Sequence, residues 1–211
     1  MPNMPAYFGR DFSDVAFHAE RLGYPASIKK PTTFFVNSMS DMFHEGVSNA
    51  AIEVSLDVMR GLPRHVFIML TKRSARMNHV CHQHGIPENI WLGVSVEHQQ
   101  TASRIESLKC ATCFHRIVSF EPLIGPVEAD LRGIDLIIIG GESGTKARKM
   151  EKSWVESLIA QSERDDCKVF FKQWGMFGED GLRVRSKKDA GRTINGRTYD
   201  ELPWVIKTHD T

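Results

Sequence analysis

The chain has 211 residues, with 27 Lys and Arg against 26 Asp and Glu, which gives a formal net charge of +1. This balance excludes a globally basic nucleic-acid-binding protein, although it leaves room for a local basic patch. The length suits one large domain or two small ones, and no apolar run approaches the roughly 18 residues of a membrane-spanning helix.

The amino terminus and the cysteines both indicate a cytoplasmic protein that does not contact a membrane. The opening MPNMPAYFGRDF lacks the charged region and apolar stretch of a secretory signal. Four cysteines, Cys81, Cys110, Cys113 and Cys167, are expected as free thiols in such a compartment rather than as a disulfide framework.

Six short apolar runs dominate the chain after an irregular amino-terminal segment, residues 1–31. They predict strands at 32–41, 65–73, 90–97, 115–122, 135–141 and 168–174. Most runs are continuously apolar instead of alternating, which is typical of strands buried on both faces of a parallel sheet. The fold predicted for residues 32–174 is therefore α/β, a partial (β/α) barrel of about six parallel strands.

Helical patterns fill most of the gaps between these strands. Ser48 is predicted to cap a helix that carries Ala51, Val54 and Val58 on one face. A second helix is predicted from Ser74 to just before Gly85.

Two further helices are predicted later in the chain, and one connection is not. Ala102, Ile105 and Leu108 follow the helical period. The stretch Ser153-Trp-Val-Glu156 has the pattern of a capping box, with Val155, Leu158 and Ile159 then facing the core. The proline-broken stretch 122–133 predicts an irregular crossover.

Residues 175–211 are predicted to be a carboxyl-terminal extension, with a hairpin at Asn195-Gly196 through a type I′ turn. Aromatic and basic side chains gather near it, and one hypothesis is that they bind nucleic acid. They are Trp174, Phe177, Arg183, Arg185, Lys187, Lys188 and Arg192. The simpler alternative is a solvated tail balanced by Glu179, Asp180 and Asp189.

Polar residues follow every predicted strand, and in parallel βα folds ligands bind at the carboxyl ends of the strands. We therefore predict a ligand site there; the alternative is that these residues only begin their loops. The predicted site residues are Ser38, Ser40, Asp41, Lys72, Arg73, Glu97, Glu121, Gly140, Gly141, Glu142, Ser143 and Lys172.

The stretch GGESG, residues 140–144, suggests one mode of binding. Gly140 and Gly141 would let backbone N–H groups approach an anionic ligand closely. The stretch matches neither the dinucleotide fingerprint nor the P-loop, which disfavours the usual modes of NAD and ATP binding.

A metal site is not predicted. Cys110 and Cys113 offer only two ligands, at the amino end of a predicted strand. His79, His82 and His84, beside Cys81, are better explained as a solvated helix end.

Seven segments in the same order resemble a phage-associated family of unknown function, over about residues 11–203. They are FFVNSMSDMFHE, MLTKR, IWLGVSVE, SFEPLIGPV, IIIGGESG, FFKQWG and GRTYDELP. Longer members of that family carry an amino-terminal three-cysteine motif similar to that of radical S-adenosylmethionine enzymes. The resemblance implies a radical-SAM-like partial barrel and S-adenosylmethionine as cofactor. This chain has no cysteine before Cys81, so a [4Fe–4S] cluster is not expected in it.

The resemblance also implies roles for the strand-end residues. Glu121 and Glu142 would accept hydrogen bonds from an amino group or a ribose hydroxyl, and Lys72, Arg73 and Lys172 would hold a carboxylate or phosphate. The leading hypothesis is a radical-SAM-like domain that lacks its cluster but keeps a polar ligand site for a small molecule. One alternative is a nucleotide- or nucleic-acid-binding phage module without catalysis, and another is a structural protein without a ligand.

Overall fold

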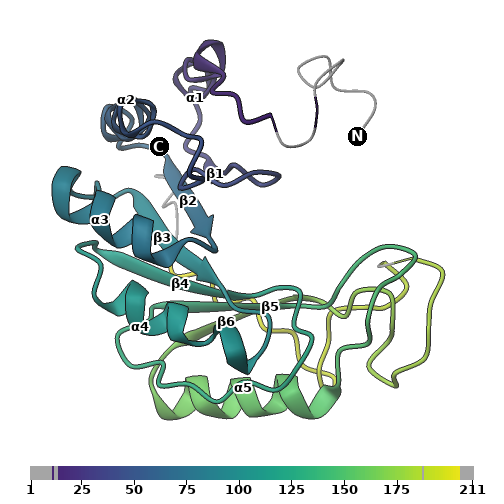
Figure 1. Cartoon of the computed structure of the whole chain (residues 1–211). Coiled ribbons are helices and arrows are strands. Elements are labelled where there is room, and N and C mark those ends of the chain that lie inside the picture. Colours follow the sequence, from purple (N-terminus) through teal and green to yellow (C-terminus); the bar gives the residue numbers. More distant parts are fainter. Residues whose placement is uncertain (1–10, 12–13, 187, 205–211) are drawn as a thin grey trace, which may run out of the picture.

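The computed structural model describes residues 11, 14–186 and 188–204, and its centre is one parallel sheet of six strands. The strands are β1 (Thr33–Val36), β2 (Val66–Thr71), β3 (Ile90–Ser95), β4 (His115–Phe120), β5 (Leu136–Gly140) and β6 (Lys168–Gln173). Their order in the sheet equals their order in the chain, and the sheet curls into a half-barrel (Figure 1). The predicted fold is confirmed, although each strand is shorter than its predicted range.

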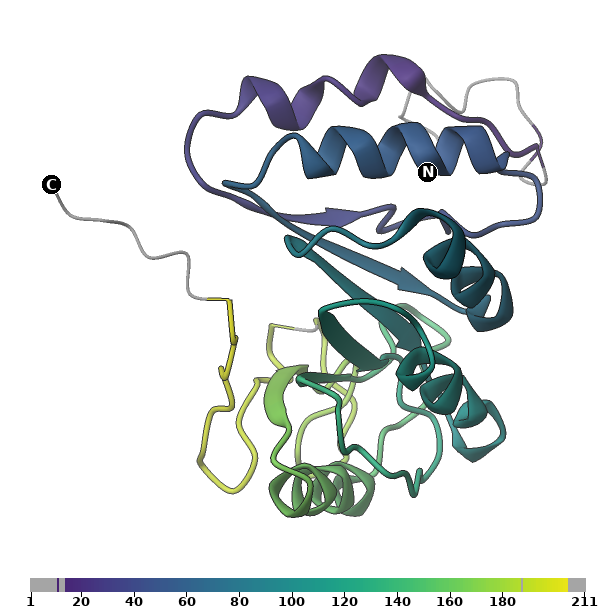
Figure 2. The same cartoon turned by 90° about the vertical axis from the view of Figure 1, so that its left-hand side faces the viewer.

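The helices cover the convex face of this sheet (Figure 1). They are α2 (Asn49–Arg60), α3 (Ser74–His84), α4 (Ser103–Lys109) and α5 (Lys152–Arg164), with the 3-10 turn η3 (Gln99–Thr101) before α4. The short helices η2 (Ala19–Arg21) and α1 (Tyr24–Ser27) run beside α2 (Figure 2). Residues 121–135, which are all described, cross from β4 to β5 without a helix, as predicted.

The start of α2 agrees with the prediction, but one of the three residues predicted for its apolar face does not. The Ser48 hydroxyl oxygen accepts a hydrogen bond from the Ala51 N–H at 3.2 Å, which caps the helix. Ala51 is buried and Val58 packs against the core as predicted, but Val54 is 48% exposed. The core side of the helix also contains Ile52 and Leu56.

The capping box predicted for α5 is wrong. The helix begins at Lys152, and its N-cap is Glu151, whose backbone is extended (φ −83°, ψ 138°). Ser153 therefore lies inside the first turn, where its own backbone is already helical. The buried face that carries Val155 and Leu158 is as predicted.

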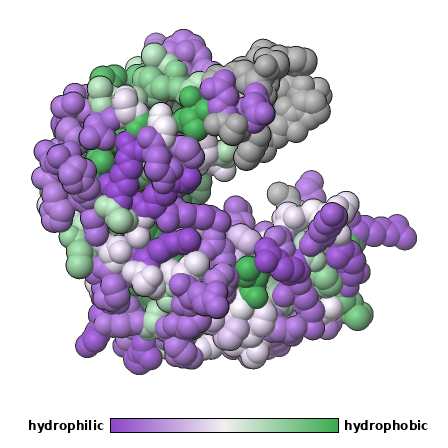
Figure 3. All heavy atoms as spheres, in the orientation of Figure 1, coloured by the Kyte–Doolittle hydropathy of each residue, from purple (hydrophilic) through white to green (hydrophobic). Residues whose placement is uncertain are grey.

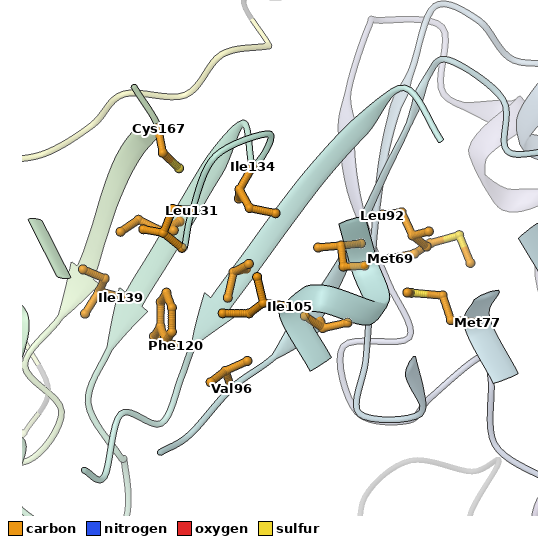
Figure 4. Packing of buried hydrophobic residues seen from close by; sticks show 14 of the residues in the cluster. Met69, Met77, Leu92, Val96, Ile105, Phe120, Leu131, Ile134, Ile139 and Cys167 are labelled. Atoms are coloured by element: carbon orange, nitrogen blue, oxygen red, sulfur yellow. The ribbon is translucent and has the colours of Figure 1, made fainter. Parts of the chain in front are cut away.

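The main core lies between the helices and the convex face of the sheet. Figure 4 shows side chains from strands, helices and the β4–β5 connection meeting there. The labelled residues are Met69, Met77, Leu92, Val96, Ile105, Phe120, Leu131, Ile134, Ile139 and Cys167. A second, smaller cluster lies on the concave face and contains Ile68, Trp91, Ile117, Leu136 and Ile138.

The carboxyl-terminal extension folds back onto β6. Asn195 and Gly196 both have positive φ (51° and 75°) and join a short antiparallel turn, as the type I′ prediction requires. Residues 197–204, which we call the C-terminal strap, then run antiparallel to β6, where the Phe171 N–H donates to the Tyr199 carbonyl at 3.0 Å. The strap thus covers the outer edge of β6.

Candidate functional site

The strand-end residues named above lie along one edge of the half-barrel, because all six strands point the same way. We call the charged residues of this edge the carboxyl rim. In the orientation of Figure 1, the surface is hollowed beside it, between the amino-terminal part of the chain and the loops of the carboxyl-terminal part (Figure 3). The rim consists of Asp41, Glu45, Lys72, Arg73, Glu97, Arg104, Glu121, Glu142, Arg148 and Lys172.

At the β1–β2 end of the rim, Asp41 and Arg73 hold a loop in place. The Asp41 carboxylate accepts from the Thr71 hydroxyl (2.8 Å), the Phe43 N–H (2.9 Å) and Arg73 Nη1 (2.9 Å). Arg73 Nε also donates to the Glu45 carboxylate, at 3.0 Å to the nearer oxygen. Both groups are therefore used in fixing the connection between β1 and α2, and their first role is structural.

Between β2 and β3, Lys72 and Glu97 form an ion pair that Arg104 completes. Glu97 Oε1 contacts the Lys72 ammonium, while Oε2 accepts from Arg104 Nη1 at 2.9 Å. The Glu97 side chain is 10% exposed, whereas that of Lys72 is 54% exposed. Burial alone would raise the pKa of Glu97, but hydrogen bonds and charges from Lys72 and Arg104 outweigh it and lower the pKa. Glu97 is thus an ionised acceptor under an accessible ammonium.

A second pair, Lys172 and Glu121, spans from β6 to β4 with a Nζ–Oε2 distance of 3.0 Å. It passes over Gly140 of β5, where an added Cβ would lie 3.1 Å from the Glu121 carboxyl carbon. Gly140 therefore gives the Glu121 side chain room to lie across β5. The Lys172 side chain is 50% exposed, so this pair also presents an accessible ammonium at the rim.

Gly141 serves the packing of the backbone rather than a ligand. Its N–H donates to the Gln173 carbonyl at 2.9 Å, and an added Cβ would lie only 2.0 Å from the Trp174 carbonyl oxygen. The predicted approach of this N–H to an anion is thus blocked, because the group is already bonded to β6.

Glu142 fixes the loop that follows. Its carboxylate accepts two hydrogen bonds from the Arg148 guanidinium, at 2.7 and 2.9 Å, and one from the Arg148 N–H at 2.8 Å. These hydrogen bonds lower the pKa of Glu142 to about 2. The predicted serines lie in exposed turns: Ser40 accepts from Asn37 at 2.7 Å, and Ser38 and Ser143 face solvent.

Arg104, Glu45 and Arg148 complete the rim but were not among the predicted site residues. Arg104 lies on α4, not at a strand end, and Glu45 lies within a loop. No sequence signal marks either, because their partners Glu97 and Arg73 are neighbours only in space.

The cysteines do not fit an iron–sulfur cluster at this rim. Burial raises the pKa of the Cys81 and Cys167 thiols to about 12, which opposes the thiolate that a cluster needs. Cys110 and Cys113 precede β4 and so lie at the amino ends of the strands, opposite the rim. Within the described ranges, no three His, Cys, Asp or Glu side chains are grouped as metal ligands.

The residues proposed for nucleic-acid stacking are dispersed. Trp174 is 2% exposed, and its indole N–H donates to the Thr193 carbonyl at 2.9 Å, so its ring is a core residue. Arg183 stacks over Phe177 at 5.3 Å and donates to the Thr145 carbonyl at 2.7 Å. Lys187 lies outside the described residues.

Comparison with known protein families matches residues 2–203 to a protein of unknown function (DUF5131). The chain belongs to this family. The resemblance to a family of unknown function is thereby confirmed, while its phage association stays a prediction. No match was found among curated proteins or among solved structures. For the described part of this DUF5131 member, no helix is long and apolar enough to cross a bilayer.

Proposed function

We propose that the carboxyl rim binds a small zwitterionic ligand, with S-adenosylmethionine as the first candidate. The observation that carries the proposal is the pair of half-exposed ammonium groups, Lys72 and Lys172, each held by a more deeply placed carboxylate on another strand. An ammonium has three donors. Each lysine can therefore keep its glutamate and also bind a ligand carboxylate.

The charge balance of the rim favours a zwitterion over a polyanion. Its cations Lys72, Arg73, Arg104, Arg148 and Lys172 are matched by Asp41, Glu45, Glu97, Glu121 and Glu142. A nucleic-acid backbone would meet as many carboxylates as ammonium and guanidinium groups, whereas phosphate binding requires an excess of cations. Because of this charge balance and the burial of Trp174, we place the hypothesis of a nucleic-acid-binding module second to that of a zwitterionic ligand.

S-adenosylmethionine fits these groups through its charged end. Its carboxylate would bind Lys72 or Lys172, and its ammonium would donate to Glu97 or Glu121. When bound, it supplies an electrophilic carbon beside its sulfonium. We propose no chemical step, because the cysteines of this chain do not fit the cluster that radical chemistry requires. The setting that we propose is the cytoplasm, together with the phage-derived genome that the family resemblance implies.

The test is a thermal-shift titration with S-adenosylmethionine and S-adenosylhomocysteine. A ligand that binds only the folded chain adds about 2.7 kcal/mol at a hundredfold excess over Kd. For a chain of this size, that corresponds to a rise in Tm of roughly 5–10 °C.

A set of matched variants makes the test specific. Lys72→Met and Lys172→Met each remove a rim ammonium. Lys168→Met is the control, because it removes an exposed lysine from the same side of β6 as Lys172, at the opposite end of the strand. We expect the shift to disappear in at least one of the two rim variants and to persist in Lys168→Met. No shift in the wild-type chain, or equal loss in all three variants, would contradict the proposal. Salt-dependent binding of a DNA oligonucleotide would instead favour the second candidate.

A further inference from the structure

One aromatic ring on the concave face is exposed. In β1, Phe34 and Val36 pack against the main core on the convex side. Since side chains alternate along a strand, Phe35 between them points to the concave side. It is 47% exposed, whereas Ile68, its register partner on β2, is 5% exposed.

The other aromatic rings on this face already have partners. Trp91 stacks on His115, with ring centroids 4.2 Å apart and planes at 6°, and the Trp204 ring meets it edge-on at 4.8 Å. The Arg192 guanidinium lies over the Phe170 ring, 5.2 Å from its centroid. Among the described residues, no ring or guanidinium stacks on Phe35. A half-exposed phenyl ring on the concave face of a sheet is suited to stack a flat ring of a ligand.

The position of Phe35 relative to the rim sets the length of such a ligand. Lys72 lies four residues beyond Ile68, on the same side of the chain, so at about 3.3 Å per residue it lies roughly 13 Å further along the strand direction. A free amino acid carries both charges on one carbon and cannot span this separation. A nucleoside with a charged group on a short 5′ tail can reach from the ring to the ammonium.

We infer that Phe35 stacks the base of a nucleoside whose charged tail binds the Lys72/Glu97 pair. This inference rests on the proposed function and deepens it, since it assigns the ring-binding part of the site and limits the ligand to nucleosides with a short charged tail. The shared element is the nucleoside, and the tail is either an amino acid or a phosphate.

The experiment compares three substitutions by isothermal titration calorimetry. Phe35→Ala removes the ring, and Phe35→Tyr keeps it. Phe114→Ala is the matched control, because Phe114 is 63% exposed and precedes β4 at the other end of the sheet. The probes are S-adenosylhomocysteine, ADP and free methionine, and Lys72→Met is titrated in parallel.

We expect Phe35→Ala to weaken binding of the nucleoside probe by about tenfold, the size of one lost base–aromatic stack. Phe35→Tyr and Phe114→Ala should bind like the wild-type chain, and any weak binding of methionine should be unchanged by Phe35→Ala. Preference for S-adenosylhomocysteine identifies an amino-acid tail. Preference for ADP identifies a phosphate tail and contradicts the zwitterionic ligand proposed above.

Two results would overturn the inference in distinguishable ways. Binding of S-adenosylhomocysteine that is lost in Lys72→Met but unchanged in Phe35→Ala refutes the ring site and leaves the proposed function standing. Absence of binding by every probe to the wild-type chain refutes both.

Discussion

Gly141 gives the sharpest test of what the glycines after β5 do. In Gly141→Ala, the new Cβ would lie 2.0 Å from the Trp174 carbonyl oxygen and 2.5 Å from its carbon. Both are backbone atoms at the end of β6, so they cannot rotate away as a side chain can. The strand end would have to retreat by about 1 Å to bring the closer contact to 3.0 Å.

The cost of that retreat follows from the contacts it strains. The Gly141 N–H donates to the Gln173 carbonyl, and the Gln173 side-chain amide donates to the Gly141 carbonyl, both at 2.9 Å. Overpacking costs about 1–3 kcal/mol and each weakened hydrogen bond about 1 kcal/mol, so we expect a loss of about 2–5 kcal/mol. For a chain of this length, that lowers Tm by roughly 5–15 °C.

Urea unfolding, followed by tryptophan fluorescence, measures the loss of unfolding free energy, and calorimetry measures the fall in Tm. Two other glycine substitutions serve as controls. In Gly140→Ala the contact is the Glu121 side chain at 3.1 Å, which can move, so stability should change by less than about 1 kcal/mol. Gly61 has a helical backbone (φ −71°) and no contact closer than 3.5 Å, so Gly61→Ala should be neutral or stabilising by about 0.4–1 kcal/mol. If Gly141→Ala were as stable as Gly140→Ala, the argument for backbone packing would be refuted.

Three further outcomes are expected. Because the pKa of Glu142 falls from 4.5 to about 2 in the folded chain, its contribution to stability is present above about pH 4.5 and is lost as the pH falls toward 2. Glu142→Gln should therefore flatten the pH dependence of urea unfolding in that window, and an unchanged slope would contradict the Arg148 contact. Trp204→Ala removes the ring that packs edge-on against Trp91 and should cost about 1–3 kcal/mol with a change in the near-ultraviolet circular dichroism, unlike Leu202→Ala at the exposed neighbour. Gly140→Ala should lower the affinity of any ligand at the rim, because the added Cβ would displace the Glu121 carboxylate that lies over Gly140. Unchanged affinity would mean that the Glu121 carboxylate does not hold the ligand.

Much of the fold was predictable because the strand centres carry a strong local signal. Leu136 to Ile139 are buried throughout, as a strand covered on both faces must be. The rotation of α2 was not predictable, since Val54 and Ile52 are both apolar and only packing against the sheet decides which one is buried. The prediction for the start of α5 was wrong for a similar reason: Ser153 fits the capping pattern, but the N-cap of the helix is Glu151.

The strand-end members of the candidate site were predictable, but their pairing was not, and neither were Arg104 on α4 and Glu45 in its loop. Sequence places Lys172 and Glu121 at strand ends, yet nothing in it shows that their side chains meet across an intervening strand. The glycine-rich stretch suggested close approach of a ligand, whereas the group that approaches Gly141 is the backbone of Trp174. Glycine permits close approach by any partner, so its identity alone does not reveal which one is present.

The matching of strand order to chain order has a consequence for how the protein is made. Each strand pairs with the one synthesised just before it, so the sheet can grow from β1 onward as the chain leaves the ribosome. At every stage the newest strand forms a bare edge, which is the kind of surface that recruits other nascent chains. The next strand covers that edge in each case except the last, since β6 waits for residues 197–204, the final described segment of the chain. The period between synthesis of β6 and arrival of this segment is therefore when the protein is most exposed to aggregation, and chains truncated before Arg197 should aggregate first.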